Sequence, residues 1–94
     1  MASEEVRVRA VVRGRVQRVG FRAFVLRHAT AAKLRGTVRN SDDGSVVAVL
    51  EGPRGDVERV IERLHQGPSI ADVQAVDVEY LEPSGDLPAI SVMA

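Results

Sequence analysis

The chain has 94 residues, no net charge and no cysteine, and only three of its side chains are aromatic. Its length suits one domain, residues 1–94, and a hydrophobic content of 45% is typical of a globular protein with an aliphatic core. The missing cysteines exclude disulfides, thiolate nucleophiles and cysteine-based metal sites. Charged residues interrupt the apolar runs near the N-terminus, so we expect no signal peptide, no membrane span and a cytoplasmic protein.

The two halves of the chain carry opposite charge. Ten of the thirteen Lys and Arg residues lie within residues 1–40, and eleven of the thirteen Asp and Glu residues lie after residue 40. A basic surface for nucleic acid would account for this, and so would pairing of the two halves in the folded chain. The second interpretation is favoured because exposed aromatic residues for base stacking are lacking. We therefore expect no nucleic-acid partner.

Periodicity predicts a strand and then a helix in the first third of the chain. Apolar residues alternate with arginines over residues 6–13, which is typical of a strand with one buried face. From Phe21 to Leu34 the apolar residues recur at helical spacing, and Gly36 would suit the C-terminal end of this helix.

A hairpin and a second helix follow. Two β-prone runs, 37–41 and 45–51, flank an Asp-Asp-Gly turn and predict a hairpin. Between Pro53 and Pro68 the apolar residues again repeat at helical intervals, with acidic residues near the start and His65 near the end. This arrangement predicts the second helix.

The last third of the chain completes the predicted fold. Residues 76–80 alternate as a fourth strand, and Ile90 and Val92 suggest a short fifth strand at the C-terminus. The order βαββαβ with one extra strand predicts an α+β, ferredoxin-like sandwich, with two helices packed on one face of a mostly antiparallel sheet.

This topology also predicts how the charged halves pair. The first strand of such a sheet lies antiparallel beside the fourth. We therefore expect Arg7 and Arg9 to face Asp77 and Glu79 across the two strands.

Residues 14–22 join the first strand to the first helix. Gly14 and Gly20 bracket five residues, and the free N–H groups and dipole at a helix N-terminus favour a bound anion. Arg22 would lie in the first helical turn, where its forked guanidinium suits phosphate or carboxylate. From these residues alone, an anion cradle and a plain strand-to-helix connection both remain open.

Asn40 is the second candidate for a chemical role. It lies near the end of the hairpin's first strand, a poor place for asparagine. It could prepare the following turn, which these residues favour, or offer a donor and an acceptor to a water molecule beside the cradle. For Asp42 and Asp43 a turn role is favoured over catalysis, and His28 and His65 are expected to be structural. We predict no metal site.

Two motifs relate the chain to a known family. Residues 14–22 are Gly-Arg-Val-Gln-Arg-Val-Gly-Phe-Arg, and residues 36–46 are Gly-Thr-Val-Arg-Asn-Ser-Asp-Asp-Gly-Ser-Val, with a later glycine at Gly52. In these motifs, and over nearly its full length, the chain resembles the acylphosphatases. It departs from the family pattern at Arg18, where the family has glycine, and at Thr37, where the family has an aromatic residue.

The resemblance implies the same fold, and hydrolysis of the carboxyl-phosphate bond of acyl phosphates by direct attack of water, without a cofactor. It assigns phosphate binding to Arg22 and water positioning to Asn40. The substrate would also be held by the loop residues Arg15, Val16, Gln17, Arg18, Val19 and Gly20. We expect a monomer. The alternative is a non-catalytic anion-binding or regulatory module on the same fold, which would need the arginine but not a water-positioning amide.

Overall fold

The structure, a computed structural model, describes residues 4–93. Its elements are β1 (Glu5–Arg15), α1 (Phe21–Ala31), β2 (Arg35–Asn40), β3 (Val46–Pro53), α2 (Arg54–Gln66), β4 (Asp72–Leu81) and β5 (Ser91–Val92). The order is the predicted βαββαβ with an additional C-terminal strand. Neither helix in this part of the chain is long and apolar enough to cross a membrane.

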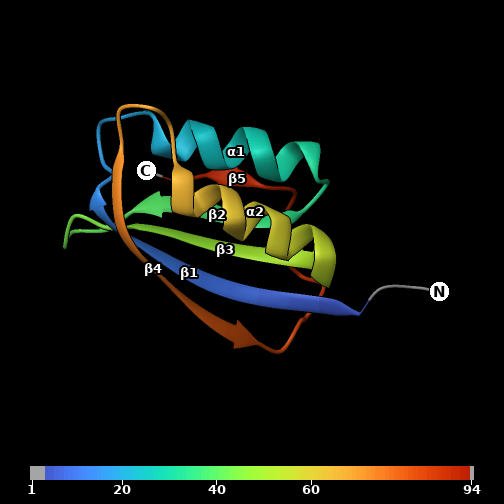
Figure 1. Ribbon diagram of the computed structural model, residues 1–94. Coiled ribbons are helices and arrows are strands. Elements are labelled where there is room, and N and C mark those ends of the chain that lie inside the picture. Colours follow the sequence, from blue (N-terminus) through green and yellow to red (C-terminus); the bar gives the residue numbers. More distant parts are fainter. Residues whose placement is uncertain (1–3, 94) are drawn as a thin grey trace.

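The five strands form one sheet in the order β4-β1-β3-β2-β5 (Figure 1). β1 is antiparallel to both β3 and β4, and β2 is antiparallel to β3. β5 alone pairs in parallel, with β2. With the two helices packed on one face of this sheet, the prediction of a ferredoxin-like sandwich with a mostly antiparallel sheet is confirmed.

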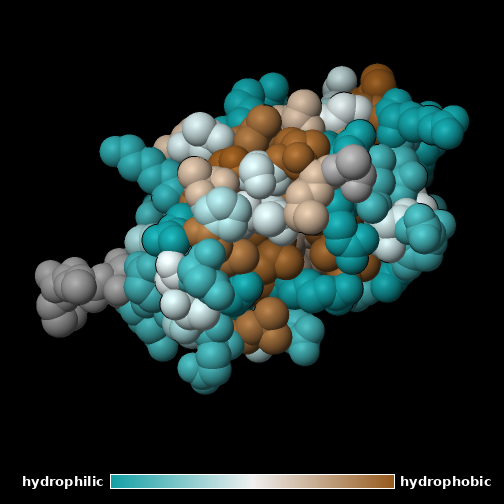
Figure 2. All heavy atoms as spheres, turned by 180° about the vertical axis from the view of Figure 1, so that it is seen from behind, coloured by the Kyte–Doolittle hydropathy of each residue, from teal (hydrophilic) through white to brown (hydrophobic). Residues whose placement is uncertain are grey.

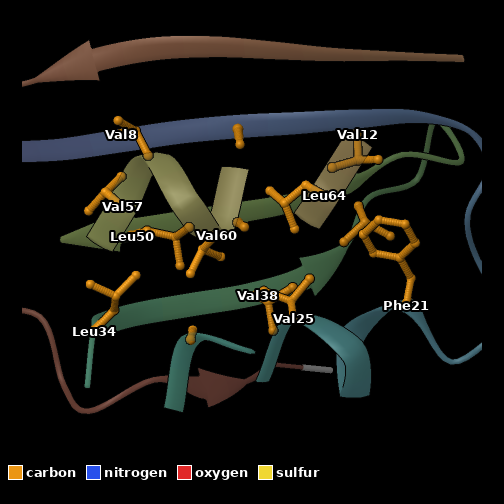
Figure 3. Packing of buried hydrophobic residues seen from close by; sticks show 14 of the residues in the cluster. Val8, Val12, Phe21, Val25, Leu34, Val38, Leu50, Val57, Val60 and Leu64 are labelled. Carbon is orange, nitrogen blue, oxygen red and sulfur yellow. The ribbon is translucent and has the colours of Figure 1, made fainter. Parts of the chain in front are cut away.

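The core lies between the sheet and the two helices and is mainly aliphatic (Figure 3). In β1, Val8, Ala10 and Val12 are fully buried, and their partners in β3, Leu50, Ala48 and Val46, are buried as well. The helices contribute Phe21, Val25, Val57, Val60 and Leu64. Burial of each of the larger side chains stabilises the fold by about 1.5 to 3 kcal/mol. Because Phe21 is the first residue of α1, its burial also holds the preceding loop against the sheet.

The first helix ends earlier than predicted. α1 ends at Ala31, and the left-handed residue that follows is Lys33 (φ 58°), so the prediction that Gly36 caps the helix is wrong. Gly36 lies in β2, where a Cβ atom would collide with the Val49 carbonyl oxygen. The glycine is therefore required by the close approach of two strands. Leu34, just before β2, is buried in the core.

The prediction that Arg7 and Arg9 face acidic residues of β4 is correct for Arg9 and wrong for Arg7. Arg9 lies opposite Glu79, but Arg7 lies opposite Leu81. On the other neighbouring strand, Arg7 is directly opposite the buried Glu51, and its guanidinium lies 3.8 Å from that carboxylate. The same guanidinium lies 3.5 Å from the exposed Asp86, so Arg7 pairs with acidic residues outside β4.

Asp77 is bound by Arg13, which was not the predicted partner. The Arg13 guanidinium donates from Nε to Asp77 at 3.1 Å and from Nη1 to Asp43 at 3.2 Å. Such exposed pairs contribute only about 0.2 to 1 kcal/mol each, but they neutralise arginines of the first half with acids of the second.

Figure 2 shows the side of the molecule away from the viewer of Figure 1, where hydrophobic residues near the middle are bordered by hydrophilic ones.

Candidate active site at the start of helix α1

A hollow of about 280 Å³ lies where the loop before α1 meets the end of β2 and β5. It is lined by Val16, Arg18, Gly20, Phe21, Arg22, Ala23, Leu26, Asn40 and Val92. The fold therefore brings Arg22 of α1 and Asn40 of β2 to the same hollow.

The loop of residues 16–20 prepares the start of α1 for an anion. Val16 is buried and anchors the loop in the core, and Gly20 (φ 80°) is the N-cap residue of α1. Among residues 4–93 no side chain caps this helix, and its first turn contains no acidic residue. The free N–H groups of the first turn therefore lack a side-chain acceptor, and together with the helix dipole they favour a bound anion.

Arg22 is held at the wall of the hollow with donors to spare. It is the second residue of α1 and is half-buried. Its Nη1 donates to the Met93 carbonyl oxygen at 3.0 Å. A guanidinium has five N–H donors, so the remaining ones can serve two oxygens of a phosphoryl group.

Asn40 presents an amide to the same hollow. It is the last residue of β2, on the same side of the strand as the fully buried Val38. Its backbone still pairs with Val46, and the turn begins only after it, with the Ser41 N–H donating to the Ser45 carbonyl oxygen at 2.8 Å. Because residues 41–45 build the turn, the Asn40 side chain is left available in the hollow.

Arg18 adopts a left-handed backbone conformation, with φ 62°. A residue with a side chain is less stable in this conformation than glycine by about 1 to 2 kcal/mol. The Arg18 side chain is exposed and forms part of the lining. Within residues 4–93 the lining of the hollow has two arginines and no acidic residue.

Three of the predicted loop residues do not line the hollow. Arg15 is the last residue of β1, and its guanidinium donates to a backbone carbonyl in the connection before β4. Gln17 Nε2 donates to the carbonyl oxygens of Ser41 at 2.7 Å and Ser45 at 3.0 Å, which joins the loop to the hairpin turn. Val19 packs against the core. The side chains of these residues position the loop and do not face the hollow.

Gly14 belongs to the sheet and not to the cradle. β1 continues to Arg15, and its pairing with β4 shifts register between Arg13 and Gly14. A Cβ atom on Gly14 would collide with the backbone of Asp72 in β4. The interpretation that two glycines bracket the anion loop is therefore wrong for Gly14, which is required by the close approach of β4.

The C-terminal segment completes the hollow, which the sequence pattern did not reveal. β5 lies beside β2, and the Met93 N–H donates to the Val38 carbonyl oxygen at 2.8 Å. Val92 lines the hollow, and the Met93 carbonyl oxygen accepts from Arg22. The alternation of Ile90 with Val92 predicts a strand but not its neighbour, because strand pairing depends on the rest of the fold.

The histidines lie outside the hollow. The His28 ring lies against that of Phe24, with centroids 4.5 Å apart. Burial, and to a lesser extent the charges of Arg27 and Arg63, lower the pKa of His28. His65 is exposed near the end of α2. Within residues 4–93 no group of three or more histidine or acidic residues is arranged to hold a metal ion.

Asp42 and Asp43 lie in the hairpin turn, away from the hollow lining. The Asp43 carboxylate accepts from the Ser45 N–H at 3.0 Å and the Ser45 hydroxyl at 2.6 Å. These hydrogen bonds, with the nearby Arg13 guanidinium, hold the pKa of Asp43 well below its usual range. The carboxylate thus stabilises the turn in its ionised form.

Comparison with known proteins gives the family. The sequence model of the acylphosphatase family matches residues 8–89. An acylphosphatase of Moorella thermoacetica is 49% identical over 81 residues, which are 86% of this chain and 87% of the relative. An acylphosphatase of Caldivirga maquilingensis is 49% identical over 88 residues, 93% of each chain.

Solved structures share the fold closely. The crystal structure of acylphosphatase from Bacillus subtilis has a TM-score of 0.91 and 34% identity, and the match covers 95% of this chain and 99% of that one. The structure of an acylphosphatase from Coxiella burnetii has a TM-score of 0.89 and 32% identity, covering 95% and 93%. By its sequence and its fold, the chain belongs to the acylphosphatase family.

Proposed function

We propose that the chain hydrolyses small acyl phosphates in the hollow at the start of α1, where Arg22 binds the phosphoryl group and Asn40 positions the attacking water. Membership of the family makes the chain an acylphosphatase, a hydrolase of acyl phosphates. The observation that carries the site assignment is that Arg22 and Asn40 line one hollow at a helix N-terminus. The alternative of a non-catalytic anion-binding module is not favoured, because the matching relatives are named acylphosphatases.

The phosphoryl group would be held by charge and by backbone donors. Arg22 can bind two of its oxygens through the guanidinium fork. Backbone N–H groups of the preceding loop, from Arg15, Val16, Gln17, Arg18, Val19 and Gly20, supply further donors. Because charge is spread over the phosphoryl oxygens in the transition state, donors fixed in advance stabilise that state without reorganisation.

Cleavage requires no general acid. The oxygen of a water molecule held by Asn40 attacks phosphorus, while the bond from phosphorus to the carboxyl oxygen breaks and its electron pair leaves with the carboxylate. The leaving group has a pKa of about 4, like Asp or Glu, so it departs unprotonated. The lining residues within the described part of the chain include no carboxylate side chain or imidazole, so a phosphoryl oxygen of the substrate takes a proton from the water. The products are a carboxylate and inorganic phosphate.

The proposal extends to the state of the protein. We expect residues 1–94 to act as a single domain and as a monomer, in the cytoplasm, without a cofactor. The ion pairs that neutralise Arg7 and Arg13 support the expectation that nucleic acid is not a partner.

Phosphate release from benzoyl phosphate tests this function directly. We expect turnover well above the uncatalysed rate, unchanged by a metal chelator, and competitive inhibition by inorganic phosphate. No release above the uncatalysed rate would contradict the function. Loss of activity with the chelator would contradict a mechanism that depends on Arg22 and Asn40 alone.

A further inference from the structure

We propose that Arg18 makes this site prefer acyl phosphates whose acyl part carries a carboxylate. The inference rests on the proposed function and names a substrate class within it. Its starting point is an arginine at a position where the backbone favours glycine. Arg18 has φ 62°, and its side chain is exposed at the hollow.

The Arg18 guanidinium is free to bind a ligand. Within residues 4–93 its side chain makes no hydrogen bond or ion pair, whereas Arg22 in the same lining already donates to Met93. A strained residue that the chain does not use for its own contacts points to a role in binding.

The phosphoryl group does not need this second cation. Arg22 and the N-terminus of α1 already provide positive charge and donors for it. Among residues 4–93 the lining contains no acidic residue that Arg18 could neutralise. A second negative group on the substrate is therefore the partner that Arg18 lacks, and a carboxylate matches the fork of a guanidinium.

The rest of the hollow suits the carbon part of such a substrate. Besides its two arginines and Asn40, the lining is glycine and apolar side chains: Val16, Phe21, Ala23, Leu26 and Val92. An acyl group bound against these side chains would carry a distal carboxylate toward the exposed Arg18, while its phosphoryl end meets Arg22.

Rigid substrate pairs test this preference. We would compare 3- and 4-carboxybenzoyl phosphate with their carbamoyl isosteres, which have the same shape and lack the second charge. The aromatic ring also prevents the carboxylate from attacking its own anhydride. For the wild type we expect kcat/KM to be roughly threefold to tenfold higher for at least one carboxylate than for its isostere. This ratio should decrease at high salt.

Three variants separate the role of Arg18 from the effect of removing a positive charge elsewhere on the protein. Arg18→Gly should bring the carboxylate and its isostere to the same kcat/KM, and Arg18→Lys should keep part of the preference. Lys33→Gly is the matched control, because Lys33 is also exposed and left-handed (φ 58°) but lies at the other end of α1, and this variant should keep the full preference.

Two results would overturn the inference while leaving the proposed function intact. One is a wild type that hydrolyses carboxylates and isosteres equally well. The other is an equal loss of kcat/KM for both members of each pair in Arg18→Gly, which would place Arg18 on the phosphoryl group. A wild type that hydrolyses none of these substrates, benzoyl phosphate included, would instead overturn the proposed function and this inference with it.

Discussion

Helix α1 has a hollow at each end, and each hollow contains a basic residue in the left-handed conformation. At the start of the helix this residue is Arg18, with φ 62°, and after its end it is Lys33, with φ 58°. The second hollow is the larger, about 520 Å³ against about 280 Å³. It is lined by Thr30, Lys33, Leu34, Arg35, Ala89 and Ile90.

Positive charge and size do not make the second hollow an anion site. It lies at the C-terminal end of α1, where the helix dipole is negative and the free backbone groups are acceptors. The donors of Arg35 are also in use, with Nε on the Leu87 carbonyl oxygen at 2.8 Å and Nη2 on that of Gly85 at 2.5 Å. Arg35 instead holds the segment that leads to β5, and β5 completes the first hollow. Helix direction and free donors therefore favour the first hollow as the proposed anion site.

Arg22→Ala should give the largest effect. Loss of a charge-assisted bidentate contact in the transition state should lower kcat/KM on the order of a hundredfold or more and weaken inhibition by phosphate. Arg22→Lys should recover only part of this, because an ammonium lacks the fork. Steady-state kinetics, with circular dichroism to check folding, would measure it. If Arg22→Ala folds normally and stays near wild-type efficiency, the assignment is wrong.

Asn40→Ala tests whether Asn40 and Arg22 have separate roles in the first hollow. Asn40 is proposed to touch water, so kcat should fall by roughly tenfold to a hundredfold, while the inhibition constant of phosphate stays close to that of the wild type. Competitive inhibition measured beside kcat would show this. An equal loss of phosphate affinity and turnover would place Asn40 on the phosphate instead.

Arg18→Gly and Lys33→Gly compare the two ends directly. Both relieve a left-handed residue, but glycine loses more conformational freedom on folding, which offsets part of the gain. Both should therefore change the free energy of unfolding by no more than about 1 kcal/mol. With benzoyl phosphate, only Arg18→Gly should raise KM, by a fewfold and mainly at low ionic strength, with kcat within a fewfold of the wild type. A collapse of kcat in Arg18→Gly, or the same KM change in both variants, would contradict the difference between the ends.

His28 should give the smallest effect, on stability and not on activity. It lies in the last turn of α1, where the dipole favours a protonated imidazole, yet burial and two arginines lower its pKa. The folded chain therefore binds this proton less readily than the unfolded chain, whose histidine has a pKa of about 6.5. The free energy of unfolding should fall as the pH drops through that value toward the lower folded pKa.

His28→Gln should flatten this dependence. Urea unfolding at several pH values between about 8 and 5 would measure the slope for both proteins. An unchanged slope in the variant would show that His28 is not the group responsible, and His65→Gln, which alters an exposed histidine on α2, serves as the control.

The amino-acid sequence by itself determined the element order, and its two motifs predicted Arg22 and Asn40 as site residues. Hydrophobic periodicity reflects which face of each element is buried, so the strands and helices could be predicted from short windows of sequence. The motif around residues 14–22 places Arg22 in the first turn of the helix that follows, because only a short loop joins this helix to the preceding strand. For Asn40 the Asp-Asp-Gly turn gives only its place at the end of a strand, and its proposed role came from the resemblance to the acylphosphatases.

The tertiary structure decided what depends on segments far apart in the sequence. Gly14 and Gly36 looked like loop and cap residues, but each is required because another strand's backbone passes too close for a Cβ atom. The same holds for the place of β5, which brings Val92 to the hollow and the Met93 carbonyl to Arg22. Periodicity within one element carries no information about which strand lies beside it, so these contacts exist only once the sheet has assembled.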